Sequence, residues 1–242
     1  MPNKLRVILP VAFLVALFSG ISSIPVAADE PPAAAEPGTD REQTTAEGEE
    51  EFSEARQEAI PVFNEGVAAI EAGDMPKALE KFQSASAIDP EFPDASRAAA
   101  AVAMELEDFQ AAADAAENLV RLDPDNADAI GTAYFAELLL GDVDRLIPSA
   151  RRLADVNPAV VSNEMLQHAQ VLFDDDLLAG SRSLLELIIE KEPELAQAYF
   201  QLGLTCNMLG DMECAKQALG KFLEIAPDDP DAATAQSLLD YL

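Results

Sequence analysis

The sequence has very few of the side chains that build catalytic and metal sites. Its 242 residues include no tryptophan, two cysteines and a single histidine, His168. No nucleophile, base and acid can be assembled into a catalytic set, and a lone histidine without ligand partners at suitable spacing does not indicate a metal centre. We expect His168 to pack against a neighbouring helix. The sequence predicts no enzyme and no cofactor, and an enzyme or metal-binding protein is kept only as the weakest alternative.

Basic residues are scarce as well. Lys and Arg number 15 against 45 Asp and Glu, and the formal net charge is −30. Nucleic-acid binding requires a basic stripe for the phosphates, so that class is excluded. The acidity has three interpretations: a solvated surface suited to solubility or a salty habitat, attraction of a basic partner, and binding of divalent cations. The acidic stretch 123–128 lacks the Gly and the distant Glu of an EF-hand, so we interpret it as a turn between helices. The stretch 174–176 is interpreted as the turn within a helix pair.

The chain also lacks an apolar run long enough to span a bilayer comfortably, which takes about 20 residues. The run 7–18 follows Lys4 and Arg6 and precedes the small residues 26–28. These features predict a signal peptide over 1–28, cleaved after Ala28, and hence a periplasmic or secreted protein without a stable membrane span. An N-terminal membrane anchor is the alternative. Residues 29–52, rich in Pro, Gly and Glu, predict a disordered acidic linker.

What the sequence does contain is a repeat. Five prolines are separated by 34, 34, 35 and 34 residues: Pro90, Pro124, Pro158, Pro193 and Pro227. Apolar residues ahead of each follow helical spacing, interrupted once by a Gly-Asp or acidic pair, as at 73–74, 141–142 and 210–211. Each unit therefore reads as helix, turn, helix and stop. The units are predicted at about 59–92, 93–126, 127–160, 161–195 and 196–229, in one domain over 53–242.

A further helix is predicted at 231–242, where Asp231 can cap the start and Ala235, Leu238 and Leu239 recur at helical spacing. It should cover the apolar end of the fifth unit, since terminal repeats need a solvated cap. Two prolines bear on helix starts. Pro148 is tolerated in a first turn, so we expect that helix to begin near Asp144. Pro61 leaves open whether the first helix begins before or near it.

The motifs of the first and fifth units resemble the tetratricopeptide repeat (TPR). The fifth reads Tyr199-x2-Leu202-Gly203-x2-Cys206, then Ala215-x3-Leu219 and Pro227. The resemblance implies an all-α, right-handed superhelical solenoid of five helix hairpins plus a C-terminal capping helix. Units two and three fit less well, because Ala116 replaces the expected Phe, Tyr134 stands at a small position and Leu146 replaces Ala. We expect those two units to pack less regularly.

The same resemblance implies a scaffold that binds a peptide or protein partner in a concave groove, and the predicted signal peptide leads us to expect an exported bacterial protein of this type. The groove positions that the resemblance implies are Phe63, Val67, Ile70, Arg97, Met104, Phe135, Phe200 and Leu204. The alternative is that these side chains pack between adjacent repeats. Carboxylate clamping is disfavoured, since Asn64 alone matches the clamp residues. The scaffold role is not separable from that of an accessory subunit in cell-wall, polysaccharide or outer-membrane biogenesis.

Cys206 and Cys214 lie four residues on either side of Gly210. An antiparallel hairpin brings them to the same level, and an exported protein permits a disulfide. Packed helices are 8 to 10 Å apart, however, and Cys214 is turned about 100° from the inward Ala215. A disulfide and two thiols therefore both remain open.

Overall fold

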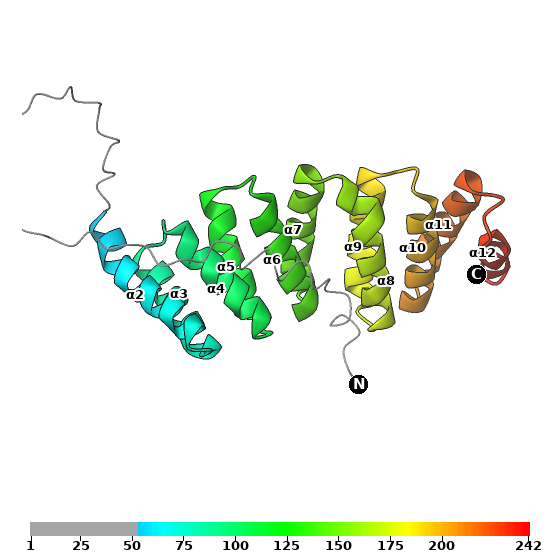
Figure 1. Ribbon diagram of the computed structural model, residues 1–242. Helices are drawn as coiled ribbons and strands as arrows, with labels where there is room; N and C mark the ends of the chain where they lie inside the picture. The colour runs from blue at the N-terminus through cyan, green and yellow to red at the C-terminus, as the bar shows by residue number, and fades with distance from the viewer. Residues whose placement is uncertain (1–52) are drawn as a thin grey trace, which may run out of the picture.

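The computed structural model describes residues 53–242, which form α-helices joined by short turns, with no strand within this range. The predicted signal peptide and acidic linker lie outside the described residues. The helices stand side by side in one extended row from α2 to α12 (Figure 1).

Ten of these helices form five hairpins, as the proline period predicts. The hairpins are α2 (Glu54–Glu71) with α3 (Met75–Ile88), α4 (Pro93–Glu105) with α5 (Phe109–Leu122), α6 (Ala127–Leu140) with α7 (Val143–Val156), η2 (Val161–Met165) and α8 (Leu166–Asp174) with α9 (Leu178–Lys191), and α10 (Ala196–Leu209) with α11 (Met212–Ile225).

The turns inside the hairpins follow the chemistry of the Gly-Asp pairs. Gly73, Gly141 and Gly210 adopt left-handed backbone with φ of 75°, 69° and 75°, a conformation that costs glycine least. The Asp after each glycine caps the next helix; the Asp211 side chain, for example, accepts from the Cys214 N–H at 3.1 Å. In units two and four Glu107 and Asp176 take the left-handed position instead.

The prolines between hairpins act through the residue before them. Each second helix ends at a residue with non-helical backbone that precedes one of the five prolines. A proline disfavours helical geometry at the preceding residue, so the chain leaves the helix there. Two other prolines lie in helix interiors, beyond the first turn. Ser53 caps α2, which passes through Pro61. The helix α7 begins at Val143, one residue from the predicted start near Asp144. Pro148 is its sixth residue, so the expected place of this proline in the first turn was wrong.

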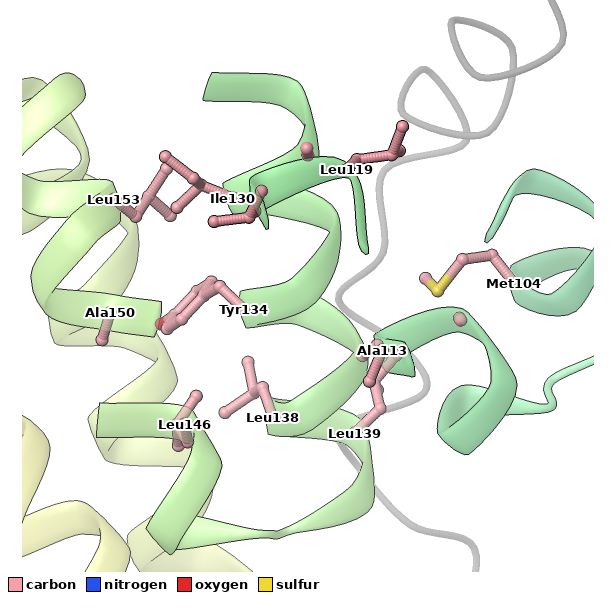
Figure 2. Close-up of a cluster of buried hydrophobic side chains, with 14 of the residues drawn as sticks. Met104, Ala113, Leu119, Ile130, Tyr134, Leu138, Leu139, Leu146, Ala150 and Leu153 are labelled. Atoms are coloured by element: carbon pink, nitrogen blue, oxygen red, sulfur yellow. The ribbon is translucent and has the colours of Figure 1, made fainter. Parts of the chain in front are cut away.

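The hairpins close through pairs of large and small side chains. In unit one a Cβ added to Gly66 would lie 2.6 Å from the Phe82 ring, so only glycine admits that ring. Unit three exchanges the sizes at the same two repeat positions: Tyr134 is fully buried and points from α6 toward Ala150 of α7 (Figure 2). The departure from the motif in unit three is therefore compensated within the same hairpin.

The junction of units three and four differs from the other junctions. Elsewhere each second helix packs on the first helix of the next unit, as α3 does on α4 and α5 on α6, but α7 packs mainly on α9. Unit four is also one residue longer, and the additional residue lies between Pro158 and Ala169. The π-helical turn η2 occupies this segment. A π turn holds one residue more than an α turn, so it accommodates the longer spacing.

The last helix, α12 (Ala232–Leu239), closes the row. Its Ala235 is fully buried in a cluster with Phe200, Leu219 and Phe222, and Leu238 and Leu239 pack against that cluster. The predicted cap is thus present, and it covers the apolar end of unit five.

Candidate functional site

A cavity of about 420 Å³ opens between the first helices of units three and four. Its walls come from one face of α6, the end of α7 and the start of the η2–α8 helix. The lining residues are Ala127, Asp128, Gly131, Phe135, Leu153, Asn157, Val160, Glu164, Gln167 and His168. A volume of this size suits a small ligand or a few side chains of a partner.

Gly131 explains why the cavity lies here. The repeat spacing places Gly131 in register with Phe63 of unit one and Phe200 of unit five. A Cβ added to Gly131 would meet no atom within 4 Å. The space that an aromatic ring fills in the outer units is therefore open in unit three.

The rings of Phe135 and His168 form the inner wall of the cavity, and the buried ring of Tyr134 packs against both. Phe135 is half-buried and lies edge-on to Tyr134 and to His168, with ring centroids 5.4 Å apart in both pairs. The Tyr134 hydroxyl lies 2.8 Å from Nδ1 of His168, and both residues are buried. Among the described residues this nitrogen is the only hydrogen-bond partner of the hydroxyl, so we assign the hydroxyl as the donor. The ring proton of neutral His168 then lies on Nε2.

Burial keeps both of these groups uncharged. It lowers the pKa of His168 to about 4. The pKa of the Tyr134 hydroxyl is raised, first by burial and then by the negative charge of Glu164. The histidine is thus a neutral hydrogen-bonding residue between two helices and carries no positive charge near pH 7.

The outer wall of the cavity is acidic. Asp128 and Glu164 are both exposed, and neither forms an ion pair within the part of the chain that the structure describes. The amides of Asn157 and Gln167 add polar groups, and no Lys or Arg lines this cavity. The arrangement therefore combines an aromatic floor with unneutralised negative charge.

The eight predicted groove residues are not equally accessible. Phe63, Val67, Met104 and Phe200 are buried, Ile70, Phe135 and Leu204 are half-buried, and Arg97 is exposed. Phe63 packs between Phe82 and Phe92 with both centroid distances at 5.2 Å. Of the eight residues only Phe135 lines the 420 Å³ cavity, while Leu204 lines a far smaller one. Partner binding by the whole set stays a prediction.

The two cysteines are joined as a disulfide, with their Cα atoms 5.8 Å apart. Gly210 turns the chain sharply between α10 and α11, so the helices are still close at this level. The spacing of 8 to 10 Å applies to helix axes farther from the turn, which is why it overstated the separation here.

Other candidate chemistry finds no support in the described residues. Between 53 and 242 no three His, Cys, Asp or Glu side chains gather where they would hold a metal ion. In the acidic stretches 123–128 and 174–176, the turns occupy residues 123–126 and 175–177, while Asp128 lies in the first turn of α6 and Asp174 ends α8. Across the same range no helix has both the length and the apolar character needed to cross a membrane.

A second cavity, of about 620 Å³, lies between α5, α6 and α7 and is lined by Arg121, Arg145 and Arg152. Arg145 contacts Asp114, Glu117 and the fully buried Glu137 at 3.0, 3.1 and 3.6 Å, and burial raises the pKa of Glu137. Arg121 pairs with Glu91. Because two of its three arginines are held by acids of the same protein, we place the candidate site at the first cavity.

Of the ten residues that line the cavity, sequence reasoning singled out only Phe135 and His168. It did not predict the lining role of Asp128, Gly131 or Glu164, nor the hydrogen bond by which Tyr134 holds His168. The signal for Gly131 was present in the sequence. The register Phe63, Arg97, Gly131, Leu166 and Phe200 contains one residue without a side chain. The π turn, which determines how Glu164 is presented, is indicated only by one spacing of 35 residues.

Comparison with known proteins agrees with this architecture. Residues 196–229 match the family profile described as Tetratricopeptide repeat. No curated protein matches the chain.

Several solved structures are similar to this chain. One is YrrB, described as a TPR protein with an unusual peptide-binding site; it is 23% identical over 74% of this chain and 92% of its own, with a TM-score of 0.41. MamA from Desulfovibrio magneticus RS-1 is 16% identical over 71% of this chain and 97% of its own, with a TM-score of 0.41. A thermophilic TPR protein from Thermus thermophilus is 19% identical over 76% of this chain and 100% of its own, with a TM-score of 0.34. Residues 196–229 therefore form a tetratricopeptide repeat, and the helix pairs that recur every 34 or 35 residues repeat its two-helix pattern along the described chain.

Proposed function

We propose that the protein is a non-enzymatic scaffold of the cell envelope that binds a peptide or protein partner across the face formed by its first helices. The observation that carries this proposal is the 420 Å³ cavity between units three and four, with half-buried Phe135 in its wall. An accessible aromatic side chain in a concave site is a typical anchor point for a partner. Phe63 and Phe200 support the proposal less, because the core already surrounds them.

The charge of the chain bears on the kind of partner. A protein of net charge −30 attracts basic segments and repels acidic ones. The cavity adds local negative charge from Asp128 and Glu164 beside its aromatic wall. We therefore propose a partner segment that presents both apolar and basic side chains.

Export to the envelope is supported by the disulfide. Bridges such as Cys206–Cys214 persist in oxidising compartments and are rare in the bacterial cytosol. Intact-mass measurement of envelope material should find Asp29 as the first residue. A mature protein that retains Met1 would instead indicate a membrane anchor.

Binding at the cavity is tested by site-specific photo-crosslinking in the producing cells. A photoreactive phenylalanine analogue at position 135 should give a discrete crosslinked partner. The same analogue at Gln217, an exposed position on α11, is the control and should not give that band. Adding Gly131→Phe, which restores the aromatic side chain of units one and five, should abolish the crosslink from position 135. Equal crosslinking from both positions, or none from position 135, would reject the proposal.

A further inference from the structure

We propose that the cavity between units three and four binds the side chain of an arginine contributed by the partner. This inference rests on the proposed function and names the residue that the site selects. Its first support is charge. Asp128 and Glu164 face the same cavity without an ion-pair partner in the described range, whereas most of the protein's own arginines are paired with acids elsewhere. A guanidinium group, with its single positive charge, would neutralise one of these two negative charges and reduce the repulsion between them.

The second support is the position of Glu164 in the repeat. Counted back five residues from the position of Gly66 in each first helix, Glu164 corresponds to the exposed Pro61 of unit one and to three buried alanines in the other units: Ala95, Ala129 and Ala198. A glutamate in that buried position would be desolvated at high cost. The additional residue of unit four forms the π turn that contains Glu164, and there the side chain is exposed on the cavity wall. Such turns are often associated with functional sites.

The third support is the aromatic wall. A guanidinium is planar, stacks on aromatic rings and forms paired hydrogen bonds with carboxylates, which an ammonium group does not do. Half-buried Phe135 lines the same cavity as the two acids. Asn157 and Gln167 offer side-chain carbonyl oxygens for the remaining N–H donors of a guanidinium.

The fourth support is the absence of a competing cation. His168 lines the cavity, and its hydrogen bond with Tyr134 and its burial keep it neutral. It therefore does not repel a positive ligand. Gly131 supplies the space, since nothing lies within 4 Å of a Cβ built there.

The test uses proton NMR of the full chain, because His168 is the only histidine of the sequence and its ring signals need no assignment. N-acetyl-arginine methylamide is titrated in buffer with about 150 mM salt, which screens diffuse attraction to the acidic surface. We expect a saturable shift of the His168 signals. The citrulline analogue, of nearly the same shape but uncharged, should bind at least tenfold more weakly, and so should the lysine analogue.

Paired variants separate the site from the overall charge. Asp128→Asn with Glu164→Gln should weaken arginine binding at least tenfold. The control pair Glu105→Gln with Asp125→Asn removes the same charge from exposed positions outside the cavity and should leave binding within twofold. Equal binding of citrulline, equal binding of lysine, or equal effects of the two pairs would each overturn the arginine assignment.

The outcome is distinguishable from failure of the proposed function. If the crosslink from position 135 persists when both cavity acids are replaced, the scaffold role stands and the arginine inference fails. If arginine binds but no partner crosslinks from position 135, the cavity is a cation site and the proposed function fails.

Discussion

The hydroxyl of Tyr134 and Nδ1 of His168 lie 2.8 Å apart and join the first helices of units three and four by a hydrogen bond. Both side chains are buried, and the two residues are one repeat length apart in the sequence. The bond therefore lies at the junction where α7 packs on α9, and it positions the inner wall of the cavity.

Replacing Tyr134 by Phe should destabilise the protein. The change leaves Nδ1 of His168 buried without its donor, at a cost of about 1–3 kcal/mol in the free energy of unfolding. Urea unfolding of the full chain measures it. Tyr199→Phe is the matched control, because the Tyr199 hydroxyl donates to the Pro193 carbonyl at 3.1 Å in an exposed setting. If both variants lost the same free energy of unfolding, the buried hydrogen bond would contribute no more to stability than the exposed one.

Stability should fall as the pH decreases from 7.5 to 5.5. The pKa of His168 is about 4 in the folded protein, against an ordinary value near 6.5. The unfolded chain therefore binds the proton first, and this contribution, complete above the ordinary value, is lost progressively as the pH falls toward 4. At pH 5.5 the loss is about 1.3 kcal/mol relative to pH 7.5. Urea midpoints at the two pH values should differ less for His168→Gln; an unchanged difference would contradict the assignment.

Reducing the Cys206–Cys214 disulfide should lower stability. The bridge spans eight residues, and the chain-entropy estimate for so short a loop is about 2.5 kcal/mol. Urea unfolding with and without a reductant measures the effect, and Cys214→Ala should match the reduced protein. A thiol assay in denaturant without reductant should find no free thiol. Two titratable thiols there would show that the bridge does not form.

Two glycines should respond in opposite directions to alanine. In Gly66→Ala the new Cβ meets the Phe82 ring at 2.6 Å, and overpacking of this kind costs about 1–3 kcal/mol. In Gly131→Ala the Cβ enters open space inside a helix, where alanine is favoured by about 0.5–1 kcal/mol. Thermal melting of both variants tests this. A loss of stability in Gly131→Ala would mean that the cavity is filled.

Deleting residues 231–242 should expose Phe200 and Phe222, which α12 covers. Burial of each such side chain contributes about 1.5–3 kcal/mol. We expect the truncated chain to melt at a lower temperature and to aggregate. A chain that melts at the same temperature and stays monomeric would show that α12 is not a cap.

The helices could be predicted from the sequence because local chemistry sets their ends. A proline disfavours helix at the residue before it, and the Gly-Asp pairs supply a left-handed residue and a cap, so the bounds follow from the positions of Pro90 or Gly73. It was harder to predict which neighbouring helix each side chain contacts. Phe63 lies on a first helix with apolar residues on two flanks, and periodicity alone does not say which flank meets α3.

The candidate site could be predicted only in part, because it depends on departures from the repeat. Phe135 follows from the motif, whereas the cavity beside it results from a missing side chain at Gly131 and from the π turn at Glu164. Tyr134 is a misfit at its own position, and its compensation by Ala150 lies on the other helix. Such effects emerge once the two helices are packed together.

The π turn at 161–165 also determines how an unequal unit fits into the row. In a continuous α-helix one added residue would rotate every later side chain by about 100° and present the wrong flank to α9. Here the rotation is confined to one turn, and Ala169 and Gly203 again follow each other at 34 residues. Angular error therefore does not accumulate along the row. One connection between units can therefore differ in length by one residue while the helices on both sides present the same side chains to their neighbours.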